Sequence, residues 1–243
     1  MKFKSEHMTQ ASGSIAGVTY ARAKGGILYR RARAIPVNPQ SPAQTQVRSA
    51  LTSLVNSWIT TLSTAQRTAW DTYGAEVLFT NKLGDPVPIS GQNAYIGANV
   101  ARMSADSKLG STLGTITAAP TVFDRGDFTT PDVVSYAVAS GLNMTFETGD
   151  AWVTEDAAAM LIFQGRPRNP SRKFFKGPWR LVGLIAGDST TPPTSPHLVG
   201  TATLMIEGFS INTGQRFSTR VVVVRADGRW SSPRKLNDVT AIA

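Results

Sequence analysis

The chain has 243 residues and a net charge of +9, with no cysteine and two histidines. Without cysteine there is no disulfide framework, no thiolate nucleophile and no cysteine-based metal site. Two histidines leave almost no material for a histidine triad or a zinc site. No apolar run approaches the roughly 18 residues of a transmembrane helix, and residues 1–7 lack the apolar segment of a signal peptide. We therefore expect synthesis in a cytoplasm and no membrane partner.

Charge is distributed unevenly along the chain. Residues 1–40 hold seven Lys/Arg and one Glu, residues 41–150 hold six Lys/Arg and nine Asp/Glu, and residues 151–243 hold twelve and six. This basic–acidic–basic layout suits contact between copies of the chain as well as binding of nucleic acid. A solvated basic surface that maintains solubility is the third interpretation.

Residues 1–40 are too short to make a domain of their own. Residues 13–35 predict two short strands around Lys24-Gly25-Gly26, and the prolines that follow favour an extended strap. A basic hairpin on such a strap needs another surface to lie on, so we predict an arm that anchors the protein to a partner. The predicted contact residues of the hairpin are Arg22, Tyr29, Arg30, Arg31 and Arg33. Those of the strap, residues 36–42, include Pro36, Asn38 and Pro39.

Three helices are predicted next, over residues 41–108. Ser41, with Pro42 at the first helical position and Gln44 in a capping box, starts the first, and Ser63 with Gln66 starts the second. Ser90 starts the third, which is expected to end near residues 105–108. The apolar positions expected on the core side of the first helix are Val47, Ala50, Leu51, Leu54, Val55, Trp58, Ile59 and Leu62. We expect Trp58 and Trp70 to pack in the corner between the first two helices.

The rest of the chain has a β pattern. Residues 109–117 are read as a linker, because residues 109–132 are rich in Gly, Ser, Thr and Pro. Seven runs of strand-forming residues then predict an antiparallel sandwich over residues 118–243. These runs are residues 133–139, 142–148, 157–164, 179–186, 198–206, 215–225 and a short edge strand at 231–236.

Two stretches resemble known families. Residues 142–148, and the strand 217–225 followed by Asp-Gly-Arg-Trp-Ser-Ser-Pro, resemble a fibronectin type III or related immunoglobulin-like domain. A second set of motifs looks like a family of small tailed-bacteriophage and prophage proteins. These motifs are Gly-Ser-Ile-Ala-Gly-Val-Thr-Tyr from residue 13, the segment 31–48, Trp58, the segment 62–70 and Ser-Gly-Gln-Asn-Ala-Tyr from residue 90. The second resemblance covers residues 13–103 and implies a structural protein of a virion; it implies no catalytic residues.

No enzyme motif is present, so we predict no catalytic residue, cofactor or metal. Gly-x-x-x-x-Gly-Lys-Ser/Thr and Gly-x-Gly-x-x-Gly are both absent. Gly187-Asp188-Ser189 lies in a Pro-rich loop without a paired histidine motif and is read as a turn. Asp124, Asp127 and Asp132 match the spacing of no cation-binding loop.

A second basic cluster lies in residues 166–180, where six Lys/Arg alternate with three aromatic residues. Arginine and tryptophan are enriched in protein–protein hot spots. Cations beside aromatic rings also suit single-stranded nucleic acid. We read the stretch first as a protein-contact loop, with nucleic acid and a plain exposed loop as alternatives. Its predicted partner-binding residues are Arg166, Arg168, Arg172, Lys173 and Trp179.

Together these patterns predict an α+β protein: a basic β-hairpin arm and a three-helix module, then an antiparallel immunoglobulin-like β-sandwich. The expected function is a non-enzymatic virion structural protein of a tailed bacteriophage, made in the host cytoplasm. A head decoration or minor capsid component anchored by the arm is preferred. The alternatives are a neck, tail or baseplate component, a carbohydrate-binding adhesin module and a nucleic-acid-binding protein. The expected partners are other capsid, portal or tail subunits and further copies of the chain.

Overall fold

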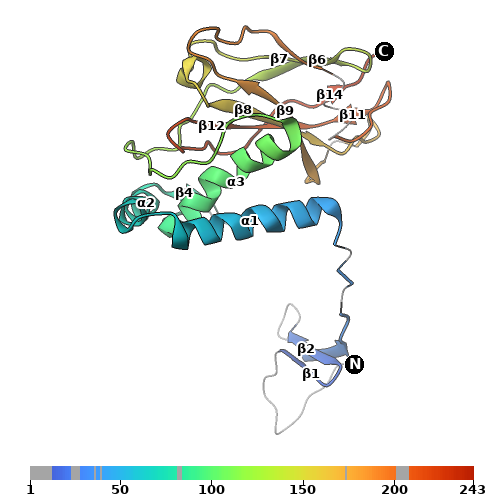
Figure 1. Cartoon of the computed structure of the whole chain (residues 1–243). Coiled ribbons are helices and arrows are strands. Elements are labelled where there is room, and N and C mark those ends of the chain that lie inside the picture. Colours follow the sequence, from blue (N-terminus) through green and yellow to red (C-terminus); the bar gives the residue numbers. More distant parts are fainter. Residues whose placement is uncertain are drawn as a thin grey trace. The chain divides into compact units, whose positions relative to one another are not determined.

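The computed structural model describes residues 13–22, 28–35, 37–38, 40–80, 84–172, 174–200 and 208–243. Within these residues the chain is α+β, with three α-helices and several antiparallel sheets (Figure 1). It divides into two compact units, Met1–Gln44 and Thr45–Ala243, which we describe separately.

The N-terminal unit is a three-stranded antiparallel sheet in the order β1-β2-β3. Its strands are β1 (Gly13–Ile15), β2 (Val18–Arg22) and β3 (Leu28–Ala32). Ala16 and Gly17 join β1 to β2 with φ values of 45° and 79°, and a two-residue type I′ turn requires positive φ at both positions. The pairing of β2 with β3 agrees with the predicted hairpin, whereas its turn at Lys24 lies outside the described residues.

The three helices begin at the predicted caps. They are α1 (Pro42–Thr60), α2 (Thr64–Glu76) and α3 (Gly91–Leu109). Ser63 forms a full capping box with Gln66, and the Ser90 side chain accepts a hydrogen bond from the Asn93 N–H. Between α2 and α3 the chain forms a small two-stranded sheet of β4 (Phe79–Thr80) and β5 (Pro86–Val87).

The helices enclose an aromatic core centred on Trp70. Trp70 is fully buried, and its ring meets Tyr73 and Tyr95 edge-on with centroid separations of 5.8 and 5.7 Å. Its indole N–H donates to the Thr117 carbonyl over 2.9 Å, which satisfies the polar end of the buried ring. Trp58 is half-buried and contacts Tyr95 from one side. Trp70 therefore lies at the centre of the predicted corner and Trp58 at its margin.

The apolar face of α1 is less covered than the sequence predicts. Among the described residues of α1, Leu54 is the one that is fully buried. Val47, Leu51 and Ile59, expected to face the core, are 51%, 44% and 61% exposed. Helical periodicity identifies an apolar stripe but does not say how much of it another element covers. The expectation that the whole apolar stripe of α1 faces the core is therefore wrong for Val47, Leu51 and Ile59.

Two larger antiparallel sheets follow, with the orders β10-β7-β6 and β13-β12-β8-β9. Between β7 and β8 the chain makes one 3-10 turn, Ala151–Thr154. The strands of the first sheet are β6 (Asp132–Ala137), β7 (Gly141–Thr145) and β10 (His197–Gly200). Those of the second are β8 (Ala159–Gly165), β9 (Trp179–Ala186), β12 (Thr219–Val224) and β13 (Arg234–Lys235). A third pairing joins β11 (Arg216–Phe217) to β14 (Val239–Thr240).

The four-stranded sheet is buried on both faces. Met160 and Ile162 belong to a core that includes Leu142 and Met144 of the three-stranded sheet. The alternate residue Leu161 packs in a different cluster with Ala105 of α3. A strand buried on both faces needs a continuous apolar run rather than an alternating one, which explains the sequence of β8. In Figure 1, α3 accordingly lies against the side of β8, β9 and β12 that faces away from β6 and β7.

Residues 109–117, predicted as a linker, are held between α3 and the sheet by polar side chains of the helix. Asn99 and Arg102 are almost fully buried. The Asn99 carboxamide exchanges hydrogen bonds with Ile116, donating to its carbonyl and accepting from its N–H. Asp106 accepts from the N–H groups of Leu113 and Gly114 over 2.8 and 2.9 Å. These contacts make the segment part of one compact unit that spans Thr45–Ala243.

Candidate functional site

The arm residues singled out from the sequence lie on a sheet that has no core of its own. None of the described residues of this sheet whose burial is defined is fully buried, and Ile15 is 72% exposed. Tyr29 is half-buried, and the other described arm residues with a defined burial are exposed: Arg30, Arg31, Arg33 and Asn38. Arg22 ends β2 opposite Leu28. Pro36 and Pro39 lie outside the described residues.

The strand register gives this sheet two chemically different faces. Val18 pairs with Ile15 and with Ala32, and Tyr20 pairs with Arg30, so these residues share one face. The other face carries Tyr29 and Arg31, together with the hydrogen-bonded hydroxyls of Ser14 and Thr19. The outer edges of β1 and β3 pair with no further named strand of the described chain. Both faces and both edges are therefore candidate contact surfaces.

The residues after β3, including the strap, add exposed apolar side chains. Ile35 is 77% exposed and Val37 is 90% exposed. Exposed aliphatic side chains at alternate positions suit insertion into a groove on another surface. The strap thus continues the candidate contact surface of the N-terminal sheet.

The second candidate is the loop 166–178, which connects β8 to β9, and its framework is Arg168. The Arg168 side chain is 5% exposed and forms an ion pair with Asp238 over 2.5 Å. Its guanidinium also donates to the Ser218 hydroxyl over 2.9 Å and to the Arg172 carbonyl over 2.7 Å. Arg168 was predicted to bind a partner, but its burial places it inside the loop, where it fixes the conformation. Sequence alone gave no sign of its pairing with an acid 70 residues away.

Aromatic rings continue this framework. Phe175 lies under the Arg168 guanidinium at 5.1 Å and meets Trp179 edge-on at 5.0 Å. Phe175 also packs over Gly165, where an added Cβ would approach the ring to 2.4 Å. Trp179 in turn lies 5.0 Å from the Arg220 guanidinium and is half-buried. Trp179 therefore holds the base of the loop as well as bordering its surface.

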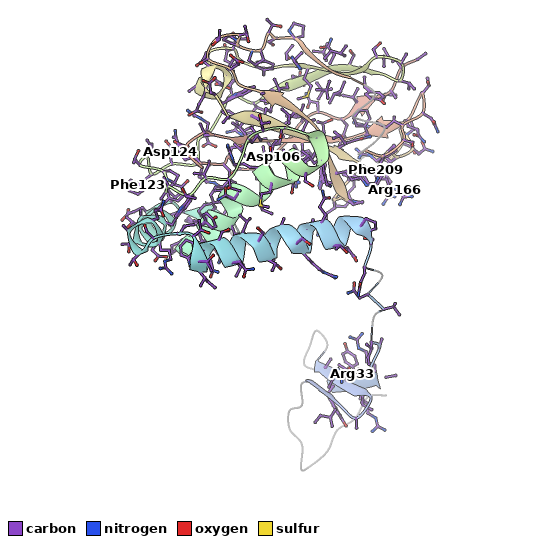
Figure 2. The ribbon with its side chains drawn as sticks, viewed as in Figure 1. Arg33, Asp106, Phe123, Asp124, Arg166 and Phe209 are labelled. Atoms are coloured by element: carbon purple, nitrogen blue, oxygen red, sulfur yellow. The ribbon has the colours of Figure 1, made fainter. Side chains whose placement is uncertain are left out.

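The remaining cations of the loop are exposed around a pocket. Arg166, Arg172 and Lys176 help to line it, with Phe174 on its wall and a volume of about 440 Å³. Phe174 is 72% exposed, and Lys173 lies outside the described residues. Phe174 and Lys176 were not among the predicted contact residues, although both lie in the same basic–aromatic stretch. Figure 2 shows Arg166 and Phe209 on the same side of the second unit, away from Phe123 and Asp124.

The ion pair at the base of the loop gives a pH-dependent stability. Burial raises the pKa of Asp238, but the hydrogen bond from Ser218 and the charges of Arg168 and Lys235 outweigh this and hold it below its ordinary value. A depressed pKa means that the pair stabilises fully above the unfolded value of about 3.9 and is lost as pH falls through the folded pKa. We expect Asp238→Asn to lower the urea midpoint of unfolding at pH 7. Below about pH 4, the difference in midpoint between the variant and the wild type should become smaller. A difference in midpoint that stays constant from pH 7 to below about pH 4 would contradict the stabilising role of the Arg168–Asp238 ion pair.

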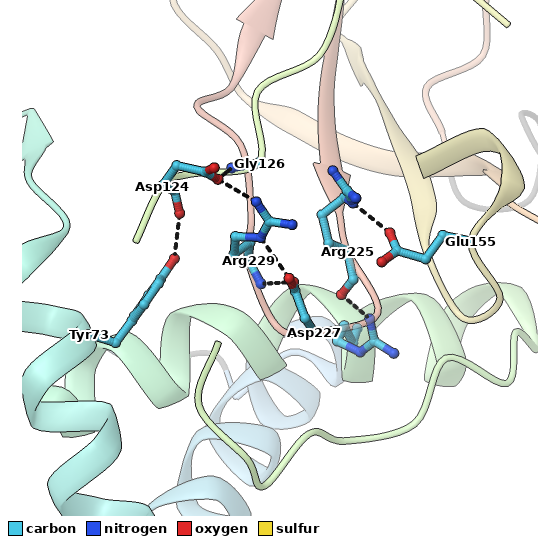
Figure 3. A network of polar contacts seen from close by, with 8 residues as sticks. Tyr73, Asp124, Gly126, Glu155, Arg225, Asp227 and Arg229 are labelled. Carbon is cyan, nitrogen blue, oxygen red and sulfur yellow. Dashed lines mark hydrogen bonds and ion pairs between the residues drawn. The ribbon is translucent and has the colours of Figure 1, made fainter. Parts of the chain in front are cut away.

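A further polar network ties the helices to the β12–β13 hairpin (Figure 3). Arg229 bridges Asp227 and Asp124 over 2.7 and 2.6 Å, and Arg225 pairs with Glu155 over 2.5 Å. The Tyr73 hydroxyl donates to the Asp124 carbonyl, and burial raises the pKa of Tyr73 to about 12. Asp124, considered above as a cation ligand, is thus engaged by arginine. No cluster of three metal-ligating side chains occurs among the described residues.

Within the described part of the chain, none of the helices has the length and apolar character needed to cross a bilayer. Comparison with known proteins gave no matching family model, no matching curated protein and no matching solved structure. The function of the chain is therefore inferred from the two surfaces described above and from the resemblances seen in its sequence.

Proposed function

We propose that this protein is a structural component of a tailed-bacteriophage particle and is anchored to a neighbouring subunit through its N-terminal sheet and strap. The observation that carries the proposal is a three-stranded sheet without a buried residue among those with defined burial. The resemblance of residues 13–103 to phage and prophage proteins suggests that the assembly is a phage particle.

The physical reason is the free energy of ordering such a sheet. Fixing each backbone residue costs about 1–2 kcal/mol of conformational entropy, which folded domains offset mainly by burying apolar surface. A small sheet gains independent stability when an apolar face is covered. The side chains available for such burial on a partner are Ile15, Val18, Tyr20, Ile35 and Val37. Arg31 lies with Tyr29 on the opposite face, where it is placed to meet acidic groups of a neighbouring subunit.

We also propose that strands β6 to β13 form an immunoglobulin-like sandwich of the fibronectin type III kind. The strand order supports it. If β6, β7, β8 and β10 correspond to strands A, B, C and E, the first sheet reads E-B-A. With β12 and β13 as F and G, the second reads G-F-C, and β9 takes the place of a C′ strand beside C. The shared core of Leu142, Met160 and Val221 supports the same arrangement.

Head decoration or a minor capsid role is the preferred position, with neck, tail and baseplate positions as alternatives. A carbohydrate-binding module would need exposed aromatic platforms. Trp152 is 1% exposed, and Trp179 and Trp230 are half-buried and already contact other rings. These three tryptophans therefore offer little surface to a sugar, and the structural role is favoured.

Mass spectrometry of purified particles of the phage that encodes this chain tests the proposal. We expect the chain to co-purify with the particle through a density gradient and to resist a high-salt wash. Hundreds of copies per particle would indicate head decoration, whereas about six or twelve would indicate the neck or tail, because these positions have different symmetries. Absence of the chain from intact particles would overturn the proposal.

A further inference from the structure

The cations around the loop pocket lack acidic partners in the described structure. The loop 166–178 contains no Asp or Glu. Asp238 pairs with Arg168, Arg216 and Lys235, whereas Arg166, Arg172 and Lys176 form no ion pair with any described residue. Three exposed cations around one pocket repel each other, and an anionic ligand would relieve that repulsion.

The pocket also presents an aromatic surface on a fixed framework. Phe174 leaves 72% of its surface to solvent on the pocket wall. The loop beside it is held by the buried Arg168–Asp238 pair and by Phe175 against Gly165. The hydrogen bonds between Arg168 and Arg216 backbones, at 2.8 and 3.0 Å, attach it to β11. A preorganised loop loses little conformational entropy when it binds a ligand.

We propose that this pocket binds single-stranded nucleic acid, with one base stacked on Phe174 and the flanking phosphates on Arg166, Arg172 and Lys176. A volume of about 440 Å³ suits one nucleotide unit. Base stacking on an exposed ring beside a basic track is the general mode of sequence-tolerant strand binding. The site is additional to the anchoring role proposed above and does not depend on it.

An acidic protein segment is the competing ligand, and it fits the pocket less well. To neutralise three cations, a protein would have to bury several carboxylates, and desolvation opposes each of them. Phosphates of a strand keep their outer oxygens in water, and their binding releases condensed counterions, which favours association at low salt. A further cation follows the loop in the sequence: the guanidinium of Arg180 on β9 lies 4.1 Å from the centre of the Phe209 ring. The chemistry therefore favours a phosphate backbone.

The test is fluorescence anisotropy of the full chain with labelled oligo(dT) of about 12 nucleotides, within the usual site size of such proteins. We expect Phe174→Ala to weaken binding about tenfold or more, because stacking on one ring is lost. The double change Arg166→Ala and Arg172→Ala should reduce the slope of log K against log salt by about 1.4, or 0.7 for each phosphate contact. The N-terminal unit is present in every variant, so these differences report the loop.

Matched controls separate stacking and local charge from general effects. Phe123→Ala removes a ring that is 53% exposed at a distant position, and Arg48→Ala removes an exposed cation of α1. Both should retain wild-type affinity and salt slope. Unchanged oligo(dT) binding by Phe174→Ala would overturn the proposal. The proposal would also be overturned if an oligoglutamate peptide bound the wild type more tightly than oligo(dT) and the same loop changes weakened that binding. The ligand would then be an acidic protein segment.

Discussion

Replacing Arg102 by leucine should destabilise the Thr45–Ala243 unit by about 3–5 kcal/mol, as removal of one partner from a buried charged contact does. Arg102 is 1% exposed, and its guanidinium donates to the carbonyls of Leu113, Gly114 and Arg225. Burial lowers its pKa, while the nearby carboxylates, chiefly Asp106, oppose that effect. Leucine would leave these buried carbonyls without donors, at about 1–3 kcal/mol for each group.

Equilibrium unfolding in urea measures this change. The matched control is Arg48→Leu, which alters an exposed position on α1 and should stay within about 0.5 kcal/mol of wild type. If Arg102→Leu cost less than about 1 kcal/mol, the segment 113–114 and the hairpin at Arg225 would not depend on the guanidinium.

The second large effect is expected at Trp70. Trp70→Ala should cost about 3–5 kcal/mol, because it opens a cavity beside Tyr73 and Tyr95 and leaves the Thr117 carbonyl without its indole donor. Trp58→Ala should cost clearly less, since Trp58 is half-buried at the margin of the same core. Thermal unfolding of the two variants gives the comparison. Equal losses, or a larger loss for Trp58→Ala, would contradict the packing of the corner.

The boundaries of the local elements could be predicted from the sequence because their signals are local. Ser63 with Gln66 and Ser90 start helices where predicted, since side-chain caps satisfy the free N–H groups of the first turn. The apolar runs at 157–164 and 179–186 correspond to β8 and β9. The later part of the predicted strand 198–206 lies outside the described residues.

The relations between distant elements could not be predicted in the same way. The predicted linker 109–117 is fixed by Asn99, Arg102 and Asp106, and the helical pattern does not reveal which backbone groups these side chains satisfy. The rule that charged residues lie outside fails where a helix must satisfy the backbone of an irregular segment packed against it. The outer face of the four-stranded sheet is apolar, and α3 packs against it.

The candidate site shows the same limit. Composition identified the basic–aromatic stretch 166–180, because clustered cations and rings can be read from sequence. It could not separate Arg168, which the distant Asp238 neutralises, from the exposed Arg166 and Arg172. That distinction depends on a contact between residues 70 positions apart, which no local pattern encodes.

Deletion of residues 1–40 tests the central claim most directly. The phage would lack its own gene for this chain, and the host cells would supply either the full-length or the shortened protein. The amount of that protein in purified particles would be measured by mass spectrometry. Because Thr45–Ala243 is a compact unit with its own cores, the shortened protein should keep the unfolding midpoint of the full chain. We predict that it is nonetheless absent from particles or strongly depleted in them. Incorporation of the folded, shortened protein at the full-length level would contradict anchoring through the N-terminal sheet and strap.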